Sequence, residues 1–127
     1  MTDENKRQGM AAEPGNEKDL DQLRESAKKT YEALRDADEN DFPPARRQEY
    51  WSDRNLARKA WEQAENAVFA NLVEEQKRRL PEVAASNAKL AKDVQATANV
   101  LAMLDVITAS LNVVADVITL LARVALK

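Results

Sequence analysis

Residues 99–123 read NVLAMLDVITASLNVVADVITLLAR, and this stretch decides the fold. The tetrapeptide Asp-Val-Ile-Thr occurs in it twice, at residues 105–108 and 116–119, an eleven-residue spacing. Eleven residues make close to three helical turns, so the repeat returns the same side chains to the same helix face. A strand is disfavoured because neighbours such as Val113 and Val114 would point to opposite faces. The stretch therefore predicts one long apolar helix over about residues 98–126.

Helical spacing divides the side chains of this predicted helix into two sets. The polar stripe, which spans an arc of about 80° at about 100° per residue, consists of Asp105, Thr108, Asn112, Asp116, Thr119 and Arg123. The apolar seam, which follows heptad spacing, consists of Val100, Leu104, Ile107, Leu111, Val114, Ile118 and Leu121. A polar stripe on such a helix is most often its solvent-facing edge. The alternatives are a hydrogen-bond ladder between chains, or the lining of a pore.

The apolar residues of the predicted helix are too many to remain in water. Burying one Val, Leu or Ile side chain stabilises a protein by roughly 1.5–3 kcal/mol. About a dozen such side chains therefore represent roughly 20–35 kcal/mol as an upper estimate. Two further helices would cover two sides of this helix. We expect the remaining side to meet a second copy, another protein or lipid.

The rest of the chain predicts an all-α fold. The only glycines are Gly9 and Gly15, and good helix formers dominate the composition. Asn16 is a good N-cap, Phe42-Pro43-Pro44 is a clear breakpoint, and Pro81 should end or kink a helix. We expect an elongated antiparallel three-helix bundle, or helical hairpin with a long apolar C-terminal helix, in a single helical domain over 16–127. Its predicted helices span about 17–39, 44–80 and 82–126, after a disordered lead-in over 1–15.

The composition argues against catalysis. Cysteine and histidine are both absent, which excludes disulfides, thiol and imidazole chemistry and nearly every zinc pattern. The chain also has no glycine-rich phosphate loop. Acidic residues such as Glu49 and Asp53 alternate with arginines on the predicted second helix, the pattern of a salt-bridged surface. We predict no enzyme activity, no cofactor and no metal site. The net charge of −3 argues against nucleic-acid binding.

Trp51 is a candidate docking anchor. It lies on a different face of the predicted second helix from the inner row of Leu56 and Ala57. Either the first helix covers it, or it anchors a partner, because tryptophan is enriched at binding hot spots.

Two functions remain open from sequence. The leading hypothesis is a non-catalytic assembly module that forms a homo-oligomer, or binds a helical partner, through its C-terminal helix. The alternative is a membrane-anchored or membrane-inserting protein, translocator- or pore-like, because 98–126 is long enough to span a bilayer. Each aspartate would oppose insertion by about 2.5–3.5 kcal/mol near the bilayer centre. The polar N-terminal residues do not resemble a signal peptide, so we expect a cytoplasmic or secreted protein, or one associated with a membrane.

Overall fold

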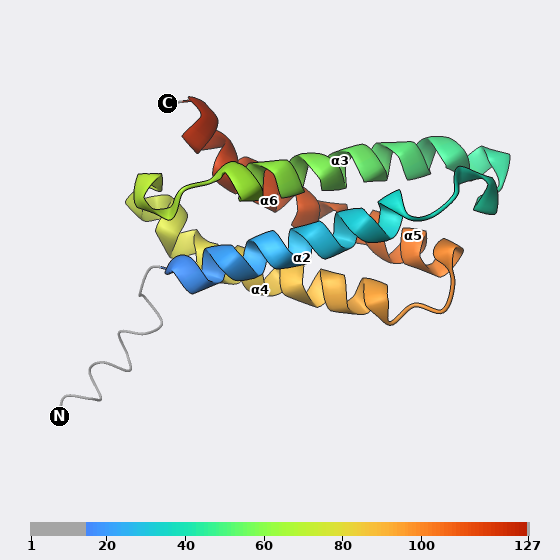
Figure 1. Ribbon diagram of the computed structural model, residues 1–127, viewed down its shortest axis with the longest axis horizontal. Helices are drawn as coiled ribbons and strands as arrows, with labels where there is room; N and C mark the ends of the chain where they lie inside the picture. Colours follow the sequence, from blue (N-terminus) through green and yellow to red (C-terminus); the bar gives the residue numbers. More distant parts are fainter. Residues whose placement is uncertain (1–14, 127) are drawn as a thin grey trace.

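The computed structural model describes residues 15–126, with side chains through residue 122 (Figure 1). Helices make up most of this part of the chain, and it contains no strand, which confirms the all-α prediction. The α-helices are α2 (Glu17–Arg35), α3 (Arg47–Asn66), α4 (Glu74–Gln95), α5 (Val100–Ala109) and α6 (Leu111–Leu126). Short 3₁₀ helices lie in the connections, namely η1 (Glu39–Asp41), η2 (Pro44–Arg46) and η3 (Phe69–Asn71). Residues 1–14 of the predicted lead-in over 1–15 lie outside the described residues.

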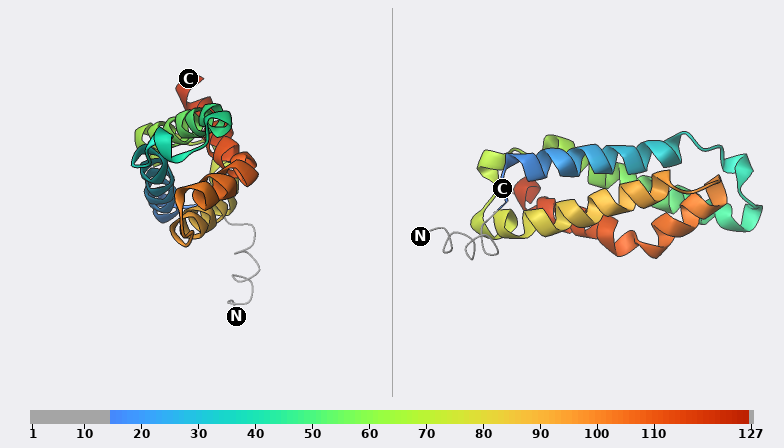
Figure 2. Two further views of the ribbon diagram at one scale, coloured as in Figure 1. Left: turned by 90° about the vertical axis from the view of Figure 1, so that its right-hand side faces the viewer. Right: turned by 90° about the horizontal axis from the view of Figure 1, so that it is seen from below.

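The helices form a four-sided bundle rather than the predicted three-helix bundle (Figure 2). α2 packs against both α3 and α4, and the α5–α6 segment packs against the same two helices on the opposite side. α3 and α4, although consecutive in sequence, therefore lie on a diagonal of the bundle. α2 and α4 run in one direction, and α3 and the α5–α6 segment run in the other. The predicted helices over 44–80 and 82–126 were wrong because they joined α3 to the first part of α4 and the rest of α4 to α5 and α6.

The start of α2 is as predicted. The Asn16 side chain accepts hydrogen bonds from the backbone amides of Lys18 and Asp19, and the Asp19 carboxylate accepts one from the amide of Asn16. This capping box satisfies amides that have no partner within the helix. The buried face of α2 includes Leu20 and Leu23. α2 ends at Arg35 rather than near residue 39, because residues 39–41 form η1 instead.

α2 and α3 satisfy each other's C-terminal carbonyl groups. The Arg24 guanidinium of α2 donates to the carbonyl oxygens of Ala64 and Ala67, at 2.9 and 2.6 Å. The buried Tyr50 hydroxyl of α3 lies 2.7 Å from the carbonyl oxygen of Leu34. Carbonyls at helix ends have no intrahelical partner. These contacts therefore stabilise the C-terminal ends of α2 and α3. α3 ends at Asn66 because of the contacts from Arg24, since no glycine or proline in the sequence signals a break there.

Pro81 lies inside α4, so it does not end a helix, and the predicted division into helices over 44–80 and 82–126 was wrong. A proline has no amide hydrogen, so the carbonyl four residues earlier, that of Lys77, loses its helical partner. The backbone amide of Gly15 donates to this carbonyl instead. The approach is close: a Cβ atom on Gly15 would lie 2.9 Å from Cδ of Pro81 and 3.0 Å from Cβ of Leu80. Gly15, predicted as part of the lead-in, is therefore packed on α4.

The predicted C-terminal helix is two helices, α5 and α6, which are bent by 55° relative to each other. Ser110 ends α5, and its amide donates to the carbonyl of Ile107 three residues earlier, at 2.9 Å. Serine competes for backbone hydrogen bonds and favours helix ends. None of the described helices alone combines the length and the hydropathy that a bilayer span requires. Taken together, the bent pair Val100–Ala109 and Leu111–Ala122 reaches both values.

The bundle itself covers most of the apolar seam. The seam residues with 2% exposure or less are Leu104, Ile107, Val114 and Leu121. Val100, Leu111 and Ile118 are half-buried. The C-terminal segment thus forms one side of the bundle, and the expected large surplus of exposed apolar surface is mostly absorbed within the chain.

Replacing Gly15 with alanine should lower the free energy of unfolding by about 1–3 kcal/mol, the usual effect of adding a methyl group to a filled site. The new Cβ would crowd the Pro81 ring and the Lys77 carbonyl. Urea unfolding followed by circular dichroism measures the change. Unchanged stability would show that Gly15 is not packed against α4.

Candidate functional site

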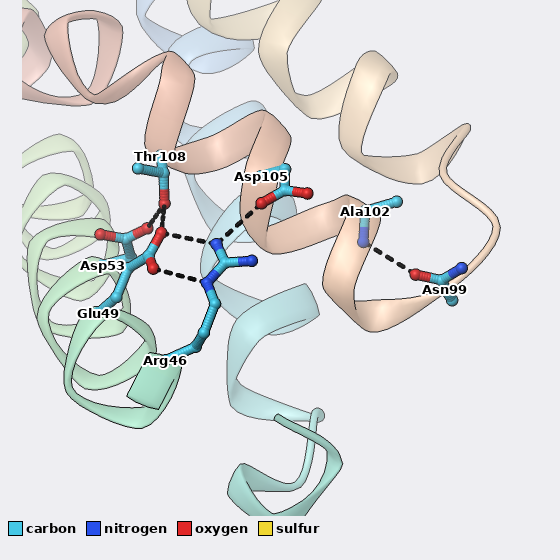
Figure 3. A network of polar contacts seen from close by, with 7 residues as sticks. All are labelled: Arg46, Glu49, Asp53, Asn99, Ala102, Asp105 and Thr108. Carbon is cyan, nitrogen blue, oxygen red and sulfur yellow. Dashed lines mark hydrogen bonds and ion pairs between the residues drawn. The ribbon is translucent and has the colours of Figure 1, made fainter. Parts of the chain in front are cut away.

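Five polar side chains meet where η2 and the first turns of α3 face α5 (Figure 3). We call this group the α3–α5 network, and it comprises Arg46, Glu49, Asp53, Asp105 and Thr108. Asp105 and Thr108 belong to the predicted polar stripe, and they come from the first copy of the Asp-Val-Ile-Thr repeat. The network joins residues that are 55 to 59 positions apart in the chain.

Arg46 bridges Glu49 and Asp105. Its Nε and Nη2 atoms donate to the two carboxylate oxygens of Glu49, each at 2.9 Å. Nη2 also donates to Oδ1 of Asp105 at 2.8 Å. The hydrogen bond from Arg46, followed by that from Thr108, lowers the pKa of Glu49 to about 2. Glu49 is therefore ionised at neutral pH, and the hydrogen bonds to Glu49 and then to Asp105 raise the pKa of Arg46.

Thr108 places one hydroxyl group between two carboxyl groups. Its Oγ1 atom lies 2.6 Å from Oε2 of Glu49 and 2.6 Å from Oδ2 of Asp53. Such distances are typical of short, charge-assisted hydrogen bonds. These contacts hold the last turns of α5 against α3, close to the bend at Ser110.

Asp53 is the buried member of the network. Its exposure is 2%, and it is the only charged residue among the buried residues that the structure describes. Burial raises its pKa above the ordinary value, and the negative charge of Glu49 acts in the same direction. The hydrogen bond from Thr108 and the charge of Arg46 oppose this rise. The network therefore holds two carboxyl groups whose pKa values are shifted in opposite directions.

The interpretation of Asp53 as part of a solvated, salt-bridged surface was wrong. Asp53 lies on the buried face of α3, four residues before Ala57 and three after Tyr50. The spacing alone could have identified it, because extending the row of buried alanines by one turn toward the N-terminus reaches Asp53. Arg46 and Glu49 carried no comparable signal, since their partners on α5 are distant in sequence.

The second copy of the repeat lies in a different environment from the first. Within the polar stripe, Asn112, Asp116 and Thr119 are exposed, whereas Thr108 is half-buried. The Arg123 side chain lies outside the described residues. The bend at Ser110 breaks the eleven-residue register, and only the first copy faces the polar start of α3. The first copy of the repeat thus contacts η2 and α3, whereas Asp116 and Thr119 of the second copy face solvent.

Trp51 remains at the surface, with an exposure of 42%. Its indole Nε1 donates to Oε1 of Glu39 at 2.7 Å, and the Arg54 guanidinium lies 4.7 Å from the centroid of its ring system. These contacts restrict the orientation of the Trp51 side chain. Its role as a docking anchor stays a prediction.

Two further polar contacts join helices in the core, whereas the buried Thr30 hydroxyl has no hydrogen-bond partner among the described residues. The Asn87 amide of α4 donates to the Ser26 hydroxyl of α2 at 2.8 Å. Gln76 donates to the Leu120 carbonyl at 2.8 Å and accepts from the Val73 amide, which joins the start of α4 to α6. In the part of the chain that the structure describes, no three Asp or Glu residues are grouped so as to hold a metal ion.

Comparison of the chain with protein-family models, with curated proteins and with solved structures finds no match.

Replacing Thr108 with valine should reduce the free energy of unfolding by about 1–3 kcal/mol, because the carboxyl groups beside it would lose their shared partner. The matched control is Thr119→Val at the second copy of the repeat, where Thr119 is exposed. That change should alter stability by no more than about 0.5 kcal/mol. Urea unfolding measures both variants, and equal effects would contradict the assigned role of Thr108.

The contribution of Glu49 to stability should disappear in acid. Its pKa is lowered in the folded protein from 4.5 to about 2, so its stabilisation is complete above pH 4.5 and is lost as the pH falls toward 2. The stability difference between the wild type and Glu49→Gln should therefore shrink over this interval.

Urea unfolding at a series of pH values measures this difference. Glu82→Gln, at an exposed position of α4, controls for the general loss of an acidic side chain. A Glu49→Gln difference that stayed constant down to pH 2 would contradict the ion-paired geometry.

Proposed function

We propose that this protein is a non-catalytic helical module that binds a second copy of itself through the outward face of α5 and α6. The observation that carries this proposal is the scarcity of charge on that face. Its exposed residues are Leu101, Asp105, Ala109, Asn112, Ala115, Asp116 and Thr119. The exposed charged residues of α4, by contrast, are Glu74, Glu75, Arg78, Arg79, Glu82, Lys89, Lys92 and Asp93.

Depletion of charge is what distinguishes the centre of a protein interface from other surface. Leu101 lies at one end of the face and is 37% exposed. The half-buried Val106 and Val113 border the face. Ala109 and Ala115 are small, which allows another helix to approach closely. One of the two carboxylates on the face, that of Asp105, already forms an ion pair with Arg46 within the chain.

This proposal moves the interface that the sequence suggested. The apolar seam is largely occupied by α3 and α4 in the same chain, so it is not free to bind a partner. Among the described residues, the adjoining outward face is exposed to solvent. A second copy is the simplest occupant, because a two-fold interface uses the same patch on both subunits.

Replacing Ala115 with lysine should convert an oligomer into a monomer, because it introduces a charge at the centre of the face without removing any buried atom. The matched control is Ala85→Lys on the charged face of α4, also at an exposed alanine. Light scattering coupled to size exclusion, without detergent, measures the mass of each protein. We expect a discrete oligomer for the wild type and for Ala85→Lys, and a monomer for Ala115→Lys.

A monomeric wild type at high concentration would contradict self-association, as would an Ala115→Lys variant with unchanged mass. Circular dichroism and urea unfolding should show that both variants remain folded. If the wild type is monomeric, the expected partner of this face is a different protein.

Membrane insertion is the second candidate, favoured by the bent pair of α5 and α6, which has the length and composition of a span. Insertion would expose to water the surfaces of α3 and α4 that now cover Leu104 and Ile107. Self-association requires no such rearrangement and is the better-supported proposal. Flotation of the full chain with anionic lipid vesicles separates the two: the protein should stay in the soluble fraction, and its recovery with the vesicles would favour insertion.

A further inference from the structure

The α3–α5 network contains fewer hydrogens than its contacts require if both carboxyl groups are ionised. Thr108 has one hydroxyl hydrogen, yet its Oγ1 lies 2.6 Å from an oxygen of Glu49 and 2.6 Å from an oxygen of Asp53. A hydroxyl can donate once and accept twice, whereas an ionised carboxylate can only accept. One of the two short contacts therefore needs a hydrogen from a carboxyl group.

The surroundings decide which carboxyl group supplies it. Glu49 receives two hydrogen bonds from Arg46, which stabilises its ionised form. Asp53 is 2% exposed, and its side-chain hydrogen bond among the described residues is with Thr108 rather than with Arg46. A buried carboxyl group without an ion-pair partner favours its neutral form. Asp53 is therefore the group that carries the hydrogen.

The elements around Asp53 supply few other charges. On its own helix it has Glu49, as well as the buried Tyr50, whose hydroxyl contacts the Leu34 carbonyl. η2 contributes Arg46, and α5 contributes Asp105, which is paired with Arg46. The described buried residues of α2, α4 and α6 include no ionisable side chain.

We propose that Asp53 binds a proton when α5 is docked on α3, and that docking of α5 is thereby coupled to pH. In the docked state the protonated Asp53 carboxyl donates to Oγ1 of Thr108, and the Thr108 hydroxyl donates to Oε2 of Glu49. Loss of the proton leaves two anions that share one donor, and the contact between α5 and α3 weakens. This coupling operates within one chain, whether or not the protein self-associates.

The direction of the pH effect follows from the raised pKa of Asp53. Stabilisation by the neutral carboxyl is complete below the unfolded value of about 3.9. It is lost as the pH rises through the folded value. The effect is thus opposite in sign to that of Glu49, which stabilises the fold above its own low pKa.

The direct test is carbon-detected NMR of the side-chain carboxyl groups in the full chain, titrated with acid and base. The Asp53 carboxyl should titrate above about 3.9, the ordinary value for aspartate. Signals of Leu104 and Ile107 on α5 should shift with the same midpoint, and those of Leu23 on α2 should not. Asp53 titrating at or below about 3.9, or α5 signals that do not follow it, would overturn the proposal.

Two variants test the shared hydrogen separately. Glu49→Gln removes the neighbouring anion and frees the Thr108 hydroxyl to donate to Asp53, so the midpoint of the Asp53 pH titration should fall. Glu82→Gln should leave that midpoint unchanged.

The Asp53→Asn side chain cannot ionise. The urea concentration at half unfolding of this variant should therefore increase relative to that of the wild type as the pH rises above about 4. Asp116→Asn, at an exposed position, should show no such gain. An unmoved Asp53 midpoint in Glu49→Gln, or a pH-independent difference for Asp53→Asn, would contradict the shared hydrogen.

Discussion

The fold depends on burial of the apolar C-terminal segment between α3 and α4. These two helices lie on a diagonal of the bundle, so each needs neighbours on both sides to cover its inner face. α2 provides the neighbour on one side, and α5 with α6 provides it on the other. Ile107 and Val117, one from each helix of the segment, have no exposed surface. The segment is therefore both the most apolar part of the chain and the part that completes the core.

The bend at Ser110 follows from the way the two halves of this segment are held. The α3–α5 network fixes α5 through Asp105 and Thr108, near the N-terminal end of α3. Gln76 fixes α6 through the carbonyl of Leu120, at the N-terminal end of α4. Each half thus has its own polar attachment to a different helix. A serine between them allows the change in direction.

The parts of the fold that depend on residues close together in sequence could be predicted from the sequence. The capping box at Asn16 and the break at Phe42-Pro43-Pro44 were expected from sequence, and the structure contains both. The end of α3 was missed because it depends on Arg24, a residue of another helix. Pro81 was misread because its effect on the backbone is compensated by Gly15, more than sixty residues earlier in the chain.

The candidate site shows the same division. Asp105 and Thr108 were identified from the repeat and the helical spacing, but their partners were not. Asp53 was assigned to the surface because its sequence neighbours are charged, whereas its helical neighbours Tyr50, Ala57 and Ala60 are buried. The spacing within α3 contained this information. The sequence could not show that α5 would bring a hydroxyl group to this aspartate.

Native-state hydrogen exchange, measured by NMR on monomeric protein, tests most directly whether the C-terminal segment is an integral side of the bundle. An integral position predicts that the amides of Leu104, Ile107, Val117 and Leu121 exchange only through global unfolding, with the same free energy as Leu23 of α2 and Leu90 of α4. Fast exchange throughout residues 100–122, with protection confined to α2, α3 and α4, would contradict it.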